Sequence, residues 1–431
     1  MRQTLFYIPH AILGLPVFGF GWLLIAWLLF AAVLLGRLVS RRGFDRETRS
    51  HIPLLLLVAA VIAFLLPRME VVSPDGAPLG LPIRGFGAML LLALLAGLAL
   101  TVHLARRAGI ERDVVYAMSF WMCVGGIVGA RSLYVIEYWH LFRRPTLTAT
   151  LWEVVKFTEG GIIIYGCFAG AMIAFLLFTA ARRLPRLLLA DVAAPGMMLG
   201  MAIGRIGCLL NGCCYGGLAT DGALAITFPR YSSPELSVVS PPYLHQWESG
   251  QLHGMQIAEE RSVLVIREVE RGSKAERAGL KPGMRIAAVC GARVASVADA
   301  RRAIASSGPE IEVTTDEGAT YRWTIGRLPE CSLPVHPTQL YSSVNAALLC
   351  LLLFSFFPLR TRDGQVFAVM LTLYPITRFL LEILRDDEPG QLGTPLTISQ
   401  ILSLIAVACA AGLWLYVARQ APHARQPLGR R

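Results

Sequence analysis

Charged residues are scarce in this chain of 431 residues. Asp, Glu, Lys and Arg make up 16% of the sequence, whereas about a quarter is usual in soluble globular proteins. Hydrophobic residues make up 55%, and the mean hydropathy is +0.56. This composition excludes an ordinary soluble protein and predicts an integral membrane protein.

Nine apolar runs approach the ~20 residues that an α-helix needs to span a bilayer, although the second run is short. We therefore predict nine transmembrane helices, at 12–36, 52–66, 85–104, 114–139, 161–181, 187–203, 340–357, 366–384 and 398–418. The first run is longer than the apolar region of a signal peptide and lacks a small-residue cleavage site, so we expect it to remain as a helix.

The sequence also lacks a single basic domain with interleaved aromatic residues, so its net charge of +11 predicts no nucleic-acid partner. The arginines gather instead in every second connection between the apolar runs, as is typical of cytoplasmic loops. This bias predicts an outward N-terminus, an inward C-terminus and an outward segment at 217–335. Arg143 and Arg144, in one outward loop, are the main exceptions.

Residues 241–330 have the composition of a soluble domain. VLVIREV alternates like a strand, SVADARRAIASS is typical of a helix, and IEVTTDEG with TYRWTIG predicts a hairpin. The run GSKAERAGLKPG resembles that of bacterial PDZ domains, although Met284 stands where those domains usually carry Asp. The resemblance implies a peptide ligand added at a sheet edge, with GMQIA from Gly254 as a candidate carboxylate-binding loop. A domain that only packs on the membrane part is the open alternative.

Arginine inside a bilayer costs about 2.5–3.5 kcal/mol, so it normally faces a cavity or a partner. Arg205 lies between Gly204 and Gly207, which would leave room for a ligand beside the backbone. Arg131 is a further candidate binding residue, whereas Arg84 begins its run and is expected to snorkel to the interface.

Arg378 shares one helical face with Tyr374 and Glu382, which lie four residues to either side. Because a guanidinium matches a phosphate with two hydrogen bonds, Arg205 and Arg378 are predicted to hold a phospholipid head group in one cavity. Structural pairing of Arg378 with Glu382 is the alternative.

The run GRIGCLLNGCCYG, residues 204–216, places three cysteines at the end of an apolar run: Cys208, Cys213 and Cys214. Their spacing matches no usual zinc motif, so we predict no metal site and no cofactor. A disulfide that pins the helix end is favoured, because the outward side is oxidising. Small-residue replacement without chemistry and a reactive thiol remain open. His336, in VHPTQLY, is either a proton carrier or an interfacial side chain.

Together these segments resemble the bacterial prolipoprotein diacylglyceryl transferase family. GRIGCLLNGCCYG is similar to the family signature Gly-Arg-x-Gly-Asn-Phe-x-Asn-x-Glu-x-x-Gly. Further segments resemble the family in the same order: IRGFGAMLL, GARSLYVIEYW, EGGIIIYGCFAGAMIA, HPTQLY and YPITRFLLEILRDDE. The resemblance leaves out the first two helices and the PDZ-like domain.

The resemblance implies a bacterial inner-membrane enzyme with a seven-helix bundle and a site open to lipid. Its reaction would move diacylglyceryl from phosphatidylglycerol to the cysteine thiol of a prolipoprotein signal peptide, releasing glycerol phosphate. Arginines would neutralise the leaving phosphate, and a base would deprotonate the thiol. The positions that match the family are Arg205, Asn211, Gly216, Tyr374, Arg378 and Glu382.

Four positions depart from the family. Phe86 replaces a tyrosine, Tyr165 a histidine, Cys208 an asparagine and Cys213 a glutamate. A phenol is a poor base near neutral pH, so the identity of the base is open, with His336 as a substitute. We predict catalytic roles for Arg205, Arg378, Glu382, Tyr374 and Tyr165, and substrate binding by Arg205, Asn211, Gly216, Arg131 and His336.

Two other readings stay open: a catalytically silent, lipid-binding relative that presents the PDZ-like domain, and a redox or metal protein built on the cysteines. The predicted fold is an all-α polytopic membrane protein of about nine helices, seven of them family-like, with an inserted α+β domain. The predicted parts are a two-helix extension (1–76), a membrane domain in two segments (77–240 and 331–420), the PDZ-like insert (241–330) and a basic cytoplasmic tail (421–431).

Overall fold

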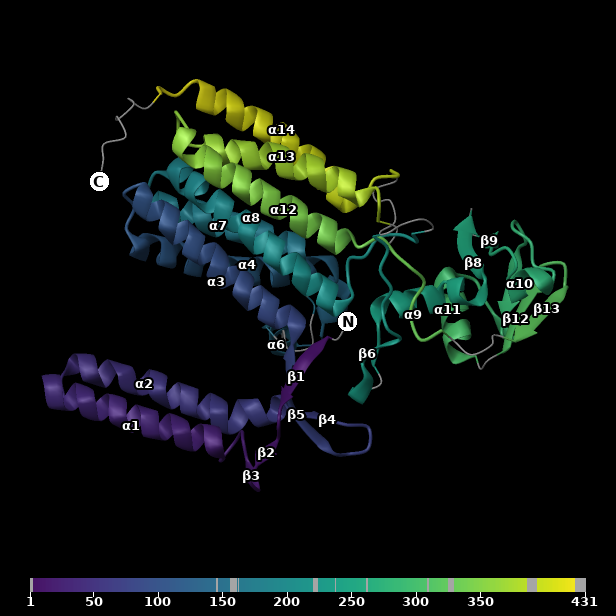
Figure 1. Ribbon diagram of the computed structural model, residues 1–431, viewed down its shortest axis with the longest axis horizontal. Coiled ribbons are helices and arrows are strands. Elements are labelled where there is room, and N and C mark those ends of the chain that lie inside the picture. The colour runs from purple at the N-terminus through teal and green to yellow at the C-terminus, as the bar shows by residue number, and fades with distance from the viewer. Residues whose placement is uncertain are drawn as a thin grey trace. The chain divides into compact units, whose positions relative to one another are not determined.

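The computed structural model describes residues 3–144, 146–155, 161, 163–219, 224–236, 238–260, 263–307, 310–324, 329–385 and 394–422. The chain divides into two compact units, Met1–Met89 with Ile206–Gln339, and Leu90–Arg205 with Leu340–Arg431. We call them the insert unit and the helical unit. Their elements are labelled in Figure 1. The predicted tail lies almost entirely outside the described residues.

Within the described residues, nine helices are long and apolar enough to cross a membrane, which confirms the predicted number and a multi-pass membrane protein. They are α1 (Trp22–Arg42), α2 (Arg46–Ala60), α3 (Gly85–Arg107), α4 (Arg112–Glu137), α7 (Ile164–Ala181), α8 (Arg186–Asn211), α12 (Thr338–Phe356), α13 (Gln365–Glu382) and α14 (Ile398–Ala418). The shorter helices α5 (Trp139–Phe142) and α6 (Leu147–Val155) lie between α4 and α7.

Three predicted spans differ from the structure by four residues or more at one end or both. The first was expected to begin at Ile12, but Ala11–Ile12 (β2) and Leu15–Pro16 (β3) pair as a tight hairpin, and α1 starts only at Trp22. The second is longer than expected, because α2 continues through a π-turn and a 3₁₀-turn to make a span at Thr48–Met69. The helix expected at 187–203 continues to Asn211 as α8, so Arg205 and Cys208 lie within it.

Glycine pairs bring α4 and α7 into close contact. Gly125 and Gly129 on α4 face Gly166 and Gly170 on α7, each pair spaced as in a G-x-x-x-G motif. A Cβ on Gly170 would lie 2.1 Å from the carbonyl oxygen of Gly125, so only glycine fits there. Such close backbone approach is the main source of helix association in lipid, where burial of apolar side chains gives little.

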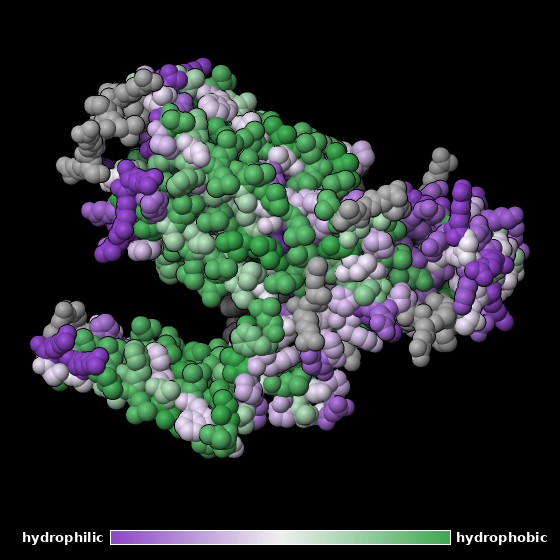
Figure 2. All heavy atoms as spheres, in the orientation of Figure 1, coloured by the Kyte–Doolittle hydropathy of each residue, from purple (hydrophilic) through white to green (hydrophobic). Residues whose placement is uncertain are grey.

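Helix α8 is the most enclosed span: 50% of its most apolar window is buried, against 17–33% for the other spans of the helical unit. It contributes to a buried core that comprises Leu104, Ala105, Val115, Val192, Ala194, Met198, Leu349, Cys350, Leu353, Phe357, Val366 and Met370. Figure 2 shows that the visible surface over the spanning helices is predominantly hydrophobic. These helices therefore pack against one another along narrow faces and present apolar side chains to lipid.

The insert unit begins with a small sheet that sequence analysis did not predict. Strand β1 (Thr4–Ile8) pairs with β5 (Pro78–Arg84), and β4 (Val71–Val72) completes the order β1-β5-β4. Gly80 permits this arrangement, because its φ is +97° and a Cβ there would lie 2.0 Å from the carbonyl oxygen of Ile8. The sheet fixes the chain immediately before α3.

The region at 241–324 has its own core. The strand, helix and hairpin predicted there are confirmed as β9 (Val263–Val269), α11 (Val297–Ser306) and β12 (Glu310–Thr315) with β13 (Thr320–Thr324). The remaining elements of this region are α9 (Pro241–Glu248), β8 (Met255–Glu260), α10 (Lys274–Arg277), β10 (Ile286–Val289) and β11 (Ala292–Arg293), and the short strands β6 (Tyr231–Ser233) and β7 (Val238–Val239) precede it. The strands form a β8-β9 pair and a sheet of order β11-β10-β12-β13. Figure 2 shows that the visible surface of this region is mainly hydrophilic.

Candidate active site in the helical unit

A buried chain of hydrogen bonds links three helices of the helical unit. The hydroxyl of Tyr165 on α7 lies 3.1 Å from Oγ of Ser399, at the start of α14. The same Oγ accepts a hydrogen bond of 3.0 Å from Nη2 of Arg378 on α13. Ser399 is only 8% exposed. Two predicted site residues, Tyr165 and Arg378, are thus joined through a serine that sequence analysis missed.

Glu382 lies at the other end of this series of hydrogen bonds, next to Arg378. Its carboxylate pairs with Nη1 of Arg378, one turn away on α13, and lies 3.5 Å from Nη1 of Arg385. It also accepts a hydrogen bond of 3.2 Å from Oγ1 of Thr397. Because Glu382 is only 2% exposed, these partners offset the cost of removing its charge from water. The Arg378–Glu382 pair that the sequence suggested as an alternative is therefore present.

The N-terminus of α14 supplies the two hydroxyls. Thr397 and Gln400 form a capping box, in which Oγ1 of Thr397 accepts from the backbone N–H of Gln400 and Oε1 of Gln400 accepts from that of Thr397. This cap fixes the first turn of the helix, and with it Ser399. The pattern T-x-x-Q before a long apolar run is visible in the sequence. It could have identified Thr397 and Gln400 as the helix cap, with Ser399 between them.

Tyr374 lies one turn before Arg378 on α13 and packs, half-buried, against the apolar core of the helical unit. Its placement on the helical face of Arg378 agrees with the prediction.

Arg205 is half-buried on α8. Within the described part of the chain it has no hydrogen-bond or ion-pair partner, and the position of a Cβ on Gly204 has no atom within 4 Å. The space expected beside Gly207 is filled, because a Cβ there would lie 3.1 Å from Cβ of Met89 and 3.3 Å from Cδ2 of Phe86. No contact among the described residues joins Arg205 to Arg378, so their shared head-group site stays a prediction.

Arg131 on α4 binds backbone. Its Nε donates to the carbonyl of Val154 at 2.9 Å, Nη2 to that of Glu153 at 2.8 Å and Nη1 to that of Gly161 at 3.0 Å. The guanidinium also lies 5.1 Å from the ring centroid of Phe142. These bonds connect α4 to the C-terminal end of α6, where the guanidinium satisfies backbone carbonyls. In this structure Arg131 therefore holds the two helices together.

The segment that follows α8 belongs to the insert unit and pairs with the segment before α12. The N–H of Gly216 donates to the carbonyl of His336 at 2.8 Å, and the N–H of His336 to that of Gly217 at 3.0 Å. Asn211 ends α8, and its carbonyl accepts from Gln3. Three predicted residues, Asn211, Gly216 and His336, are thus located near the end of α8.

The three cysteines of the signature are close together. The Sγ atoms of Cys208, Cys213 and Cys214 all lie within 4.8 Å of one another, and each residue is half-buried. None of the nine cysteines, all of which lie in the described part of the chain, forms a disulfide, so the disulfide favoured from the sequence is not present there. This cluster is the set among the described residues whose side chains could hold a metal ion.

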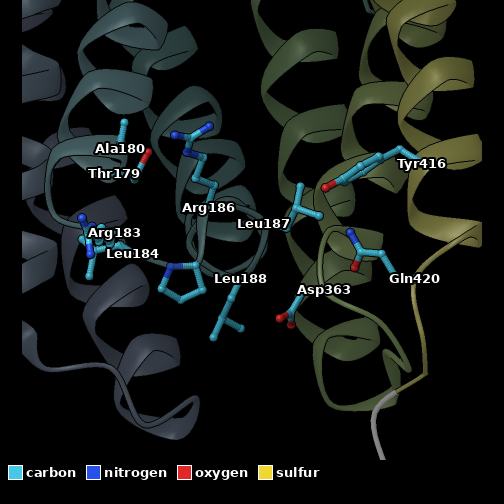
Figure 3. A pocket seen from close by; sticks show the side chains of 11 residues that line it. Thr179, Ala180, Arg183, Leu184, Arg186, Leu187, Leu188, Asp363, Tyr416 and Gln420 are labelled. Carbon is cyan, nitrogen blue, oxygen red and sulfur yellow. The ribbon is translucent and has the colours of Figure 1, made fainter.

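An open pocket of about 530 Å³ lies elsewhere in the helical unit. It is lined by residues at the end of α7, the start of α8, the connection before α13 and the end of α14, including Arg183, Arg186, Asp363 and Tyr416 (Figure 3). The predicted site residues are not among those that line it, so it does not define the active site.

The nine spanning helices and the buried guanidinium–carboxylate–hydroxyl chain define a polytopic membrane protein with a polar site among its helices. A family model for prolipoprotein diacylglyceryl transferase matches residues 76–416, which is most of the chain. The chain belongs to that family.

Curated relatives agree. A phosphatidylglycerol–prolipoprotein diacylglyceryl transferase from Rhodopirellula baltica is 32% identical over 440 aligned residues, covering 95% of this chain and 88% of the relative. Enzymes of the same name from Clostridium tetani and Deinococcus radiodurans are 23% and 33% identical. The alignment with the Clostridium tetani enzyme covers 76% of this chain and 90% of the relative. The alignment with the Deinococcus radiodurans enzyme covers 34% of this chain and 43% of the relative.

Proposed function

We propose that the protein transfers the diacylglyceryl group of phosphatidylglycerol to the cysteine thiol of prolipoprotein signal peptides, releasing glycerol phosphate. Family membership supports the reaction, and the observation that carries it in this chain is Arg378, whose side chain is only 14% exposed and is held by Glu382 and Ser399 between the helices. A buried arginine is costly in a membrane and is retained where it meets an anion.

Arg378 is proposed to hold the phosphate of the lipid. The bonds to Glu382 and Ser399 fix the orientation of its guanidinium, so the charge is in place before the lipid arrives. Arg205, half-buried and unpaired within the described residues, is proposed as a second phosphate ligand. Positive charge at the leaving oxygen favours its departure as the C–O bond breaks.

The other predicted residues have supporting roles in this proposal. Tyr165 orients Ser399 and thereby Arg378, and Tyr374 lies beside Arg378 on α13. Asn211, Gly216 and His336 are proposed to contact the peptide substrate near the end of α8, whereas Arg131 positions α6.

One assay tests the reaction directly. The full chain, in bilayers that contain phosphatidylglycerol, is incubated with a lipobox peptide, and mass spectrometry measures addition of a diacylglyceryl group to the cysteine. We expect product with the native chain and none with Arg378→Ala or Arg205→Ala. Arg107→Ala, at an exposed arginine that ends α3, is the matched control and should remain active.

Absence of product from the native chain, while another family enzyme is active in parallel, would overturn this proposal in favour of a silent lipid-binding relative. Full activity of Arg378→Ala would remove that residue from the mechanism.

The region at 241–330 is proposed to be a PDZ-like domain, because its strand pair, short helix α10 and helix α11 follow the order of the resembling run. Strand β8 is the edge to which a peptide would add. Part of that edge is already used, since the N–H of Ile257 donates to the carbonyl of Ser249. This bond favours packing of the chain's own segment over an external ligand at that position.

We also propose that the protein lies in a bacterial inner membrane. Its N-terminus and the PDZ-like region at 241–330 would lie outside, and its C-terminus would lie in the cytoplasm. The arginine bias of alternate connections supports this orientation. Cys331, exposed in the insert unit, provides the test. A membrane-impermeant maleimide should label it from outside intact spheroplasts, and labelling only after lysis would reverse the proposed topology.

A further inference from the structure

Three thiols of the insert unit, those of Cys208, Cys213 and Cys214, lie close together in the structure. Cys208 lies in the last turn of α8, and Cys213 and Cys214 follow in the segment after it. Their Sγ atoms all lie within 4.8 Å of one another. Three half-buried thiols at this separation are close enough to share one metal ion.

The backbone that carries these thiols is fixed from several sides. The N–H of Cys213 donates to the carbonyl of Cys208 at 3.1 Å. Nε2 of Gln339 donates to the carbonyl of Cys213 at 2.8 Å, and Oγ1 of Thr338 donates to that of Cys214 at 2.7 Å. Because the start of α12 holds both carbonyls, the backbone that carries Cys213 and Cys214 is fixed beside the end of α8.

We propose that Cys208, Cys213 and Cys214 bind a zinc ion. Thiolates are ligands that zinc prefers, with Zn–S distances near 2.3 Å, so two thiolates of a tetrahedral site lie about 3.8 Å apart. The observed separation of at most 4.8 Å therefore requires the cluster to contract by no more than about 1 Å.

The geometry leaves one zinc position for an external ligand. Among the described residues, no fourth His, Cys, Asp or Glu joins the cluster. Zinc is usually four-coordinate, and sites with three protein ligands keep the fourth position for water or substrate. A thiol that binds there loses its proton, because a coordinated thiol is deprotonated by the metal.

The fourth ligand follows from the proposed function, on which this step rests: it is the cysteine of the prolipoprotein. Its proton passes to water, and its sulfur forms a bond to the glycerol carbon of the lipid. The C–O bond of that carbon breaks, and its electron pair leaves with the phosphate oxygen as glycerol phosphate. Three cysteinates already give the zinc site a net negative charge, so the bound sulfur stays electron-rich and nucleophilic.

This role also accounts for the family positions that differ. Tyr165 replaces the family histidine, and cysteines occupy two signature positions where the family carries asparagine and glutamate. A zinc-bound thiol needs no strong protein base, because the metal lowers the pKa of its ligand. The exchange of a base for a metal site explains both changes together.

Metal analysis of the full chain, purified in detergent without chelator, tests the site. We expect one zinc per chain in the native protein and in Cys331→Ser, whose exposed thiol lies outside the cluster. Cys213→Ser should bind zinc at least ~100-fold more weakly, since loss of even an indirect partner costs 10–100-fold. Cys213→His, which restores a zinc ligand, should recover binding and shows that the fold is intact.

Cobalt substitution tests the open position without relying on activity. Cobalt-loaded protein should show sulfur-to-cobalt charge-transfer absorption that intensifies with a lipobox peptide and stays unchanged with the same peptide carrying serine for cysteine. An unchanged spectrum with the cysteine peptide would overturn the thiol-binding role.

The remaining outcomes separate this inference from the proposed reaction. Transfer that persists in chelated, zinc-free protein would overturn the role of zinc in the reaction and leave the function standing. A disulfide within the cluster in the active enzyme would overturn the zinc site itself, again without touching the function. Zinc binding and peptide-dependent spectra without any transfer would instead refute the proposed function.

Discussion

Replacement of Glu382 by glutamine should destabilise the helical unit strongly. Glu382 is 2% exposed and is the carboxylate that faces the guanidinium groups of Arg378 and Arg385. The arginine side chains are only 14% and 8% exposed, so neither charge is well hydrated. The neutral amide keeps the shape of the side chain and removes only the negative charge.

The size of the effect follows from these contacts. At 3.5 Å and an effective dielectric constant of about 20, the Arg385–Glu382 attraction alone is roughly 5 kcal/mol before desolvation is counted. Breaking a buried ion pair by removing one partner costs about 3–5 kcal/mol, because the remaining charge stays buried. We expect a loss in that range for Glu382→Gln. Arg378→Gln should cost less, since Arg385 and Thr397 remain to satisfy the carboxylate.

A double-mutant cycle provides the measurement. Native chain, both single variants and Arg378→Gln/Glu382→Gln are unfolded reversibly in mixed micelles, followed by tryptophan fluorescence. Because the double variant removes one charge of each sign, it should be more stable than the sum of the single losses predicts, by at least about 1 kcal/mol. Additive losses, or a Glu382→Gln variant as stable as the native chain, would refute the reasoning.

Further predictions concern packing and pH. Gly170→Ala should cost about 1–3 kcal/mol of stability, because its Cβ would lie 2.1 Å from the carbonyl oxygen of Gly125; Gly412→Ala, where no atom lies within 4 Å, is the neutral control in the same melting experiment. Burial lowers the pKa of His253, in the insert unit, from 6.5 to about 4, so the unfolded chain binds a proton more readily. Stability should therefore fall by up to about 3 kcal/mol as the pH decreases from about 6.5 to about 4, and His253→Phe should remove this slope in thermal melts; an unchanged slope would contradict the assignment.

The sequence by itself determined the class of protein. Long apolar runs must become helices in a bilayer, because lipid offers no hydrogen-bond partner to the backbone, and this rule gave the nine spans and most of their bounds. The strand, helix and hairpin of the insert region also followed from local alternation and turns. The run GRIGCLLNGCCYG, together with five further segments in the same order, was enough to indicate the family.

Contacts between distant parts of the chain were decided only by the tertiary structure. Ser399 is 234 residues from Tyr165, and no local pattern pairs them. The small sheet formed by β1 and β5 likewise joins segments that are separated by two helices. For the cysteines, spacing alone indicated no metal site, whereas the turn after α8 brings the three sulfur atoms together. Local propensity sets which residues form a helix or strand, but the approach of side chains depends on how those elements pack, and that is a property of the whole fold.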